Sequence, residues 1–327
     1  MMDYTFVDHT QVRDLIEQVT MLEAVAFAEY EGAPTFDESF TEWYLRRPGS
    51  TAKLCVAALD DEQMVSVVLV AIQPVQLGGK VLDCGIIDSV ATHPQHRRRG
   101  LARKLMEMAH ETMRVAGADA GVLYTNPEDH PYQFYQRLGY QTRAICRMME
   151  GKRPAENGAL MVRAADVVEH EMIARMLNEF YSAHEGYAPL SAELWEWHKV
   201  ARPIAMEPLL LVAEADGKLA ATCTYAEVPV LLRGDTVTVA VLSDSAYDAD
   251  ACDGAEALMS VLAAAPRENV VCLVDESDPL ADLYAGAGFE KAVSEVSMVL
   301  PFSKAAHEAM ANKCGPWYVM VESVIGV

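Results

Sequence analysis

The sequence predicts an α/β (α+β) protein made of two tandem copies of one domain, each a mixed, mostly antiparallel, twisted sheet flanked by helices. The chain has 327 residues, 51% of them apolar, which is enough to form the cores of about two domains. The order of helical and strand patterns in the first half recurs in the second. A motif recurs too: Tyr135-Gln-Arg-Leu-Gly139-Tyr140 returns as Tyr284-Ala-Gly-Ala-Gly288-Phe289, at the same distance behind the strands that start at Val122 and Val271.

The first half alternates between the two periodicities of apolar residues, period 2 for strands and about 3.6 for helices. Turn signals such as Asp60-Asp61-Glu62 and Gly78-Gly79 separate three strands that form an antiparallel meander. The expected strands are 4–7, 53–59, 64–73, 80–92, 122–125 and 141–149, and the expected helices are 11–29, 37–45, 100–115 and 131–138.

The second half repeats this order after a polar, turn-rich segment. The expected strands are 160–163, 209–214, 219–228, 236–243, 270–274 and 292–300, and the expected helices are 167–184, 192–200, 254–265 and 280–287. We therefore expect a first domain at 1–150, a linker at 151–159, a second copy at 160–301 and a tail at 302–327. The pattern of the tail predicts a helix over 303–313 and a strand over 317–324 at a sheet edge.

Charge and cysteine usage narrow the class of protein. A net charge of −22 argues against nucleic-acid binding, which depends on neutralising phosphates, and favours solubility first and attraction of cationic substrates second. The seven cysteines contain no Cys-x-x-Cys pair, which argues against a zinc site and a disulfide framework. No apolar run is long enough to span a bilayer, and the start has no pattern of a signal peptide. We expect a cytoplasmic protein with no metal, no membrane and no nucleic-acid partner.

One turn in the first half carries the clearest functional chemistry. The strand 80–92 runs into His93-Pro94-Gln95-His96 and then into Arg97-Arg98-Arg99-Gly100, where an amphipathic helix begins. The N-terminus of a helix presents unsatisfied backbone N–H groups and the positive end of its dipole. Gly100 permits close approach to a ligand, and arginine adds charge-assisted hydrogen bonds to phosphate. A basic turn in this context is typical of a pyrophosphate-binding loop.

At these residues the chain resembles the GNAT superfamily of acyl-coenzyme A-dependent N-acetyltransferases. The phosphate loop of that family, Arg/Gln-x-x-Gly-x-Gly/Ala, is matched by Arg97-x-x-Gly100-x-Ala102, and a Val-x-x-x-Pro strand end precedes it at Val90 to Pro94. The helix Tyr followed by Gly and an aromatic residue is matched by Tyr135 to Tyr140. The resemblance covers roughly 4–150 by motif and 160–300 by pattern, and it implies two tandem GNAT-like domains.

The resemblance also implies roles for individual residues. Backbone groups at Val90 and Thr92 would pair with the pantetheine arm of acetyl-CoA, and Asn126 would contact the cofactor. Tyr135 would protonate the leaving thiolate. The expected cofactor-binding set is Val90, Ala91, Thr92, Arg97, Arg98, Arg99, Gly100, Leu101, Ala102 and Asn126.

The general base is less well defined by the resemblance. The family often has a Glu on the central strand where this chain has Ile86, so Asp88 is the candidate base. An alternative interpretation is that Asp88 only bonds a neighbouring loop. For Tyr135 the alternative to the catalytic role is packing against the sheet.

The second copy is expected to lack the site. With Gly100 aligned to Gly254, the three arginines face Ala251-Cys252-Asp253, and an acidic loop repels a pyrophosphate. Asn126 faces Asp275, and only Tyr284 matches its counterpart. We therefore expect one active copy and one degenerate copy.

These features together predict an acetyltransferase that transfers acetyl from acetyl-CoA to a primary amine of a small molecule by direct attack. The main alternative is a non-catalytic acyl-CoA-binding or regulatory protein. The expected partner is a small-molecule amine, and a homodimer stays open.

Overall fold

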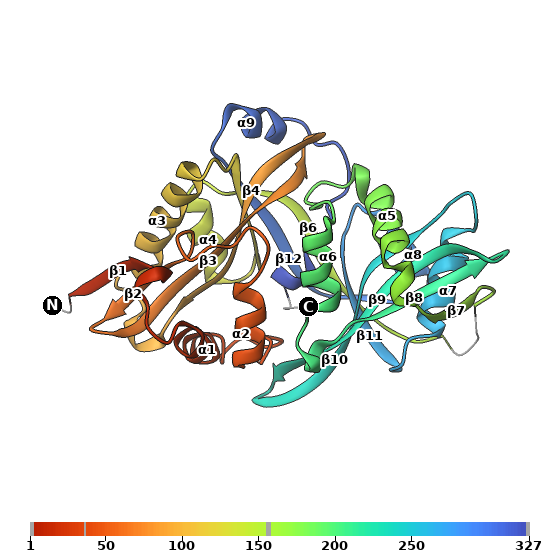
Figure 1. Cartoon of the computed structure of the whole chain (residues 1–327), viewed down its shortest axis with the longest axis horizontal. Coiled ribbons are helices and arrows are strands. Elements are labelled where there is room, and N and C mark those ends of the chain that lie inside the picture. Colours follow the sequence, from red (N-terminus) through yellow and green to blue (C-terminus); the bar gives the residue numbers. More distant parts are fainter. Residues whose placement is uncertain (1–2, 36, 155–157, 325–327) are drawn as a thin grey trace.

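The computed structural model describes residues 3–35, 37–154 and 158–324. Within these residues the strands form one 12-stranded sheet in the order β1-β2-β3-β4-β5-β12-β6-β11-β10-β9-β8-β7. Figure 1 shows the two halves of the chain side by side, with the two halves of the sheet meeting near the centre. The predicted fold class, two tandem α/β domains of one kind with mostly antiparallel sheets flanked by helices, is confirmed.

The first half contains the elements expected from its periodicity. They are β1 (Tyr4–Asp8), α1 (Leu15–Ala26), α2 (Glu38–Leu45), β2 (Val56–Asp60), β3 (Gln63–Leu77), β4 (Lys80–Thr92), α3 (Leu101–Val115), β5 (Ala120–Thr125), α4 (His130–Arg137) and β6 (Gln141–Lys152). One buried cluster contains side chains of α1 and α2, and a separate one contains side chains of α3 and α4. In α3 the buried residues lie at helical spacing, with Leu105, Met106, Ala109 and Met113 all fully buried.

The second half repeats the same order. Its elements are β7 (Met161–Ala164), α5 (His170–Phe180), α6 (Ala192–Trp195), β8 (Leu209–Ala215), β9 (Lys218–Leu232), β10 (Asp235–Tyr247), α7 (Gly254–Ala263), β11 (Asn269–Asp275), α8 (Pro279–Gly286), β12 (Glu290–Pro301) and α9 (Lys304–Met310). A π-helical turn, Glu196–Val200, continues α6.

The internal repeat extends to the register of the strands. In the first half β4 pairs in parallel with β5 at Ile86 and Val122, and in the second half β10 pairs with β11 at Val241 and Val271. An antiparallel bulge follows in both, at Ser89 and at Asp244, each with a positive φ. Equivalent bulges at equivalent positions indicate two copies of one fold.

The last strands of the two copies are exchanged. Strand β12 of the second copy pairs with β5, with Val296 opposite Thr125, while β6 of the first copy pairs with β11. The two exchanged strands also pair with each other, and Glu295 lies opposite Cys146. Because each has the alternating pattern that either neighbour accepts, the sequence alone does not distinguish exchange from the simpler arrangement.

The exchange affects how domain boundaries are defined. A cut at residue 150 follows the chain, but each half-sheet takes one strand from the other copy. The expected linker 151–159 overlaps the end of β6 at Gly151 and Lys152, and residues 155–157 lie outside the described residues. The boundaries themselves stay a prediction.

The structure corrects part of the prediction for the tail. The helix expected over 303–313 is present as α9, but the strand expected over 317–324 is absent. Trp317 makes one isolated bridge to Glu185, and Val321–Ser323 form a 3-10 turn. The reason lies in the backbone donors, because side chains accept from two of them in place of a neighbouring strand. Trp317 N donates to the Asp275 carboxylate at 2.7 Å, and Met320 N donates to the Tyr124 hydroxyl at 3.1 Å.

Candidate functional site

The site begins where β4 and β5 separate. Their pairing covers only Cys84–Ile86 and Ala120–Val122, so among the described residues the two strands have no pairing beyond Ile86. At that point β4 bulges, and Ser89 takes a φ of 49°. A strand that loses its neighbour leaves backbone N–H and C=O groups open to a ligand. The central sheet is therefore interrupted at the carboxyl ends of β4 and β5.

A cavity of about 370 Å³ fills this opening. Four of the predicted site residues line it: Asp88, Val90, Asn126 and Tyr135. Further lining comes from the strands around the gap, and also from the loop after α1, from α2, from the exchanged strand β12 and from the tail. The tail residue Ser323 lies beside the β4 bulge, with its Oγ 3.4 Å from Asp88 Oδ2, a contact that no pattern in the sequence predicts.

Tyr135 reaches the cavity from α4. Its ring is buried in the cluster that covers the α3 and α4 side of the sheet, and burial raises the pKa of its hydroxyl. Within the described residues that hydroxyl has no hydrogen-bond partner. The equivalent Tyr284 hydroxyl is bonded to Ser245 Oγ at 2.7 Å, and Ser245 takes the place of Val90. Both phenols are therefore protonated, but only the Tyr135 hydroxyl is left available to a ligand, because the Tyr284 hydroxyl is already bonded to Ser245.

The arginine turn lies at the start of α3, outside the cavity lining. Arg98 and Gly100 both have positive φ, at 61° and 81°, and no side chain of the described residues caps α3. When right-handed and left-handed backbone conformations alternate along a turn, successive backbone N–H groups point into one concave site that can bind an anion. A Cβ on Gly100 meets nothing within 4 Å, so this glycine is required by its φ and its open side faces free space.

The three arginines do not act alike. Arg97 donates to the carbonyl oxygens of Ala26 and Thr92 and pairs with Glu29, so its side chain holds the turn against α1. Arg99 Nη1 donates to the Tyr4 hydroxyl at 2.7 Å. Arg98 is exposed. The backbone and Arg98 are therefore the better-placed phosphate ligands of this turn.

The remaining residues of the predicted cofactor-binding set direct their side chains away from the cavity. Ala91 is buried in the core, and the Thr92 hydroxyl is hydrogen-bonded to Ser66 Oγ at 2.7 Å. Leu101 is buried, and Ala102 is half-buried in the first turn of α3. Only the backbones of these residues are placed to contact a ligand, as the resemblance implies for Thr92.

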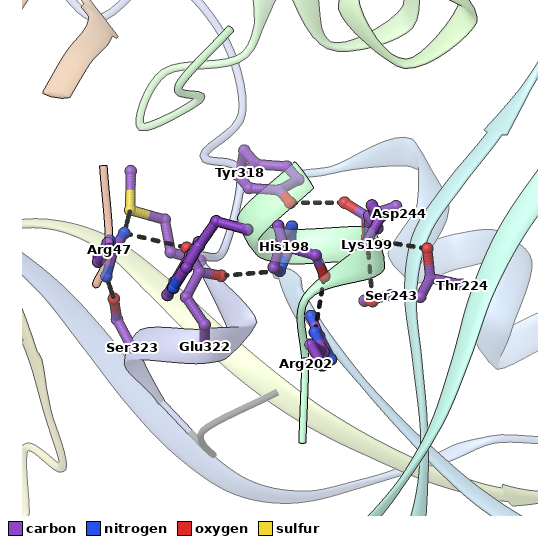
Figure 2. Close-up of polar contacts among 12 residues, drawn as sticks. Arg47, His198, Lys199, Arg202, Thr224, Ser243, Asp244, Tyr318, Glu322 and Ser323 are labelled. Atoms are coloured by element: carbon purple, nitrogen blue, oxygen red, sulfur yellow. Dashed lines mark hydrogen bonds and ion pairs between the residues drawn. The ribbon is translucent and has the colours of Figure 1, made fainter. Parts of the chain in front are cut away.

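Asp88 belongs to a buried ion cluster. Arg47, which follows α2, donates from Nη1 to Asp88 Oδ2 at 3.1 Å and from Nη2 to Glu322 Oε1 at 3.0 Å. Arg47 Nη1 also donates to Ser323 Oγ at 3.1 Å, as Figure 2 shows. Burial raises the pKa of Asp88, and the Arg47 guanidinium opposes that rise. This pairing supports the second interpretation of Asp88, a bond to a neighbouring segment, here the tail.

The cavity is acidic. Within the described residues its charged lining consists of carboxylates alone, Glu31, Asp88, Asp129, Glu295 and Glu322. Aromatic rings of Phe27, Tyr30 and Tyr124 complete the walls. Such a lining attracts a cation and offers apolar surface beside it.

A symmetric layer of aromatic and arginine side chains joins the two copies. Trp43 and Trp197 stack with ring centroids 4.6 Å apart, and each indole N–H donates to the other's backbone carbonyl at 2.9 Å. Arg47 lies over Trp197, and Arg202 lies over Trp43. The sequence signal is Trp43-x-x-x-Arg47-Pro48 against Trp197-x-x-x-x-Arg202-Pro203. One extra residue, absorbed by the π-helical turn, hides this repeat.

The equivalent opening in the second copy is closed. Its cavity measures about 30 Å³, and Trp317 and Tyr318 of the tail are among its lining. The Tyr318 hydroxyl donates to Asp244 Oδ1 at 2.6 Å, and Lys199 pairs with the same carboxylate and with Thr224 (Figure 2). The tail therefore fills the opening of the second copy and contributes polar groups to the cavity of the first.

The phosphate loop of the second copy is also closed. The alignment of Gly100 with Gly254 that the sequence suggests is wrong by one residue. The residue that caps α7 is Asp253, so Gly100 corresponds to Asp253 and Arg98 to Ala251. The Asp253 carboxylate accepts from Ala255 N at 2.9 Å and from Glu256 N at 3.3 Å. An internal carboxylate thus occupies the N–H groups that a phosphate would use.

Two other kinds of feature are absent from the described part of the chain. No group of three or more His, Cys, Asp or Glu side chains there is arranged to hold a metal ion. No helix there is both long enough and apolar enough to cross a membrane.

Part of the first half is similar to a known protein family. Residues 10–143 match the family described as an acetyltransferase (GNAT) domain. No curated protein matches the sequence.

Solved structures resemble almost the whole chain at low sequence identity, and they confirm the GNAT-like fold. N-myristoyltransferase from Saccharomyces cerevisiae with bound myristoyl-CoA has a TM-score of 0.72 at 13% identity, covering 92% of this chain and 83% of its own. A GCN5-related N-acetyltransferase from Anabaena variabilis has a TM-score of 0.66 at 12% identity, covering 91% and 72%. A probable N-acyltransferase from Enterococcus faecalis has a TM-score of 0.65 at 14% identity, with the same coverage of 91% and 72%.

Proposed function

We propose that the protein transfers acetyl from acetyl-CoA to a primary amine of a small cationic molecule, because residues 10–143 match the GNAT acetyltransferase domain. The amine nitrogen attacks the thioester carbonyl, the new N–C bond forms, and the C–S bond breaks. The leaving thiolate takes a proton from Tyr135, and the amine gives one up to a base.

One observation carries this proposal: the first copy alone combines an uncapped, left-handed turn at Arg98 and Gly100 with an open strand gap that leads to Tyr135. An anion-binding turn followed by a gap between strands suits a long cofactor with a pyrophosphate at one end and a thioester at the other. The second copy has the same elements, but Asp253 and the tail occupy both places.

The acidic lining supports a cationic acceptor. The charged lining within the described residues consists of carboxylates, and the chain as a whole carries −22, so a small polyamine or amino compound is attracted in preference to an anion. The acetyl preference rests on the description of the matching family. The yeast N-myristoyltransferase structure holds myristoyl-CoA, so a donor with a longer acyl chain should be compared with acetyl-CoA.

Thiol release tests the function directly. Acetyl-CoA and myristoyl-CoA are each incubated with butylamine, 1,4-diaminobutane and spermidine, and free coenzyme A is followed with time. We expect turnover with acetyl-CoA and a preference for the amines with two or more charges. Tight coenzyme A binding without turnover on any acceptor supports the alternative, a non-catalytic acyl-CoA-binding or regulatory protein.

Replacing Tyr135 tests the acid. Tyr135→Phe removes the hydroxyl and keeps the ring, and because general acid catalysis contributes about 10²–10⁴-fold, we expect kcat to fall by about 100-fold. Coenzyme A affinity, measured by calorimetry, should change little. The matched control is Tyr284→Phe, whose hydroxyl is bonded within the closed second copy, and it should leave kcat unaffected. Equal kcat for wild type and Tyr135→Phe would remove the acid from the mechanism.

A further inference from the structure

One cavity carboxylate comes from the second copy. Glu295 lies on β12, the strand that the second copy places between β5 and β6, and it lines the cavity of the first copy. Its carboxylate has no hydrogen bond or ion pair with another described residue. It is the exchange of strands that brings this side chain to the site.

The other carboxylates of the lining are occupied or peripheral. Asp88 and Glu322 share the Arg47 guanidinium. Glu31 Oε2 accepts from Arg233 N at 2.8 Å, and Asp129 is exposed in the loop before α4. Among the described residues, Glu295 is therefore the cavity carboxylate that is half-buried and has no bonded partner.

Glu295 and Tyr135 reach the cavity from opposite faces of the sheet. Glu295 lies directly opposite Cys146, and Cys146 packs in the cluster that contains α1 and α2. Its neighbour Val296 points the other way, into the cluster that contains Tyr135. A thioester held in the gap between β4 and β5 would thus have the phenol on one side and this carboxylate on the other.

The electrostatic surroundings keep the carboxyl group basic. Burial raises the pKa of Glu295 to about 8, and the charge of Asp129 adds to the rise. The titratable groups that interact with it are Asp129 from the loop before α4 and Cys146 from β6. Glu322 of the tail lines the same cavity, and the described cavity lining adds no cation. A base with proton affinity near neutral pH is suited to accept a proton from an attacking amine.

We propose that Glu295, carried into the first copy by the exchanged strand of the second, accepts the proton that the acceptor amine loses during acyl transfer. This inference rests on the proposed function. The N–H proton passes to the Glu295 carboxylate as the N–C bond forms, and the thiolate receives the Tyr135 proton. Exchange of protons with solvent then restores both groups. The degenerate copy thereby supplies a working residue to the intact one.

The experiment compares Glu295→Gln with wild type, with acetyl-CoA and 1,4-diaminobutane as the probes. Because general base catalysis contributes about 10²–10⁴-fold, we expect kcat to fall by about 100-fold while KM for the amine changes by less than about threefold. In wild type kcat/KM should rise with pH through about 8, where the carboxyl group of the free enzyme ionises, and this limb should be missing in the variant. Glu290→Gln, an exposed position on the same strand, is the matched control and should behave as wild type.

Two further readouts separate the possible failures. Coenzyme A affinity and Tm report whether Glu295→Gln folds, and since a carboxyl group with a raised folded-state pKa opposes folding above its unfolded-state pKa, the variant should be at least as stable as wild type at pH 8. A raised KM with nearly unchanged kcat, or an intact limb near pH 8, would overturn the role as proton acceptor. Absence of turnover in the wild type would instead refute the proposed function, and this inference with it.

Discussion

The double variant Arg98→Glu/Gly100→Asp should lose coenzyme A binding. The change places in the first copy what the second copy already has, a carboxylate at the residue that caps the helix. In the second copy Asp253 accepts from two backbone N–H groups of α7. At Gly100 a carboxylate would compete for the corresponding groups of α3, and the Arg98→Glu change would add a second negative charge beside the pyrophosphate. Since a hydrogen bond to a charged group contributes about 1.5–3 kcal/mol, losing two of them weakens affinity by about 100-fold or more.

Calorimetric titration with coenzyme A measures this effect, and two matched variants interpret it. Gly100→Asn has nearly the same shape without the charge, and Asn tolerates a positive φ, so it separates repulsion from steric effects. The fold should tolerate these side chains because a Cβ at Gly100 meets nothing within 4 Å. Ala251→Glu places a charge at the position equivalent to Arg98 in the second copy and should leave binding unchanged. If Ala251→Glu abolished binding and the double variant did not, the cofactor site would lie in the second half.

Local patterns in the sequence are sufficient to predict the elements and the residues that act through local geometry. Strand β4 has the bounds that its pattern predicts, and the turn at Arg98 and Gly100 is predictable because a strand end, a Pro and a helix start are adjacent in sequence. Tyr135 is identifiable because its motif is short. Such features depend on neighbours a few residues away, and these are what periodicity and turn chemistry report.

Features that depend on distant pairing are not predictable in this way. The strands 141–149 and 292–300 are both apolar and alternating, so their exchange leaves no trace in either. Glu295 escapes prediction for that reason, because its presence at the cavity depends on the exchange. The alternation of the tail predicts an edge strand, whereas side chains of both copies, Asp275 and Tyr124, accept from two of its backbone N–H groups. The single residue inserted in the π-helical turn also hides from the sequence that Arg47 and Arg202 are equivalent positions of the two copies.

Arg47 and Arg202 should contribute very differently to stability despite their symmetric positions. Arg47 bonds Asp88, Glu322 and Gln73. In the second copy the residues at the strand positions of Asp88 and Gln73 are Ser243 and Val228, so Arg202 lacks both partners. Its Nη1 and Nη2 are buried without a hydrogen-bond partner among the described residues, and its Nε donates to the His198 carbonyl at 2.7 Å.

Replacing each arginine by Met should therefore change the free energy of unfolding by different amounts. Arg47→Met leaves two buried carboxylates unpaired, and removing one partner of a buried ion pair costs about 3–5 kcal/mol. Burial lowers the pKa of Arg202 to about 10, and the nearby carboxylates of Glu322 and Asp244 offset only part of this cost of burying the charge. Arg202→Met removes that unfavourable charge and keeps apolar contact with Trp43, so we expect a free energy of unfolding within about 1 kcal/mol of wild type, or above it.

Urea unfolding at two pH values tests both the asymmetry and its cause. Without Arg47, the folded-state pKa values of Asp88 and Glu322 lie above their unfolded-state values, because burial already raises the pKa of each. The folded variant then binds more protons than the unfolded chain, so its stability increases as pH falls. The penalty of Arg47→Met should therefore be smaller at pH 5 than at pH 8. If Arg202→Met lost as much stability as Arg47→Met, the second arginine would have partners of equal strength. The divergence of the two copies would then not extend to the layer that joins them.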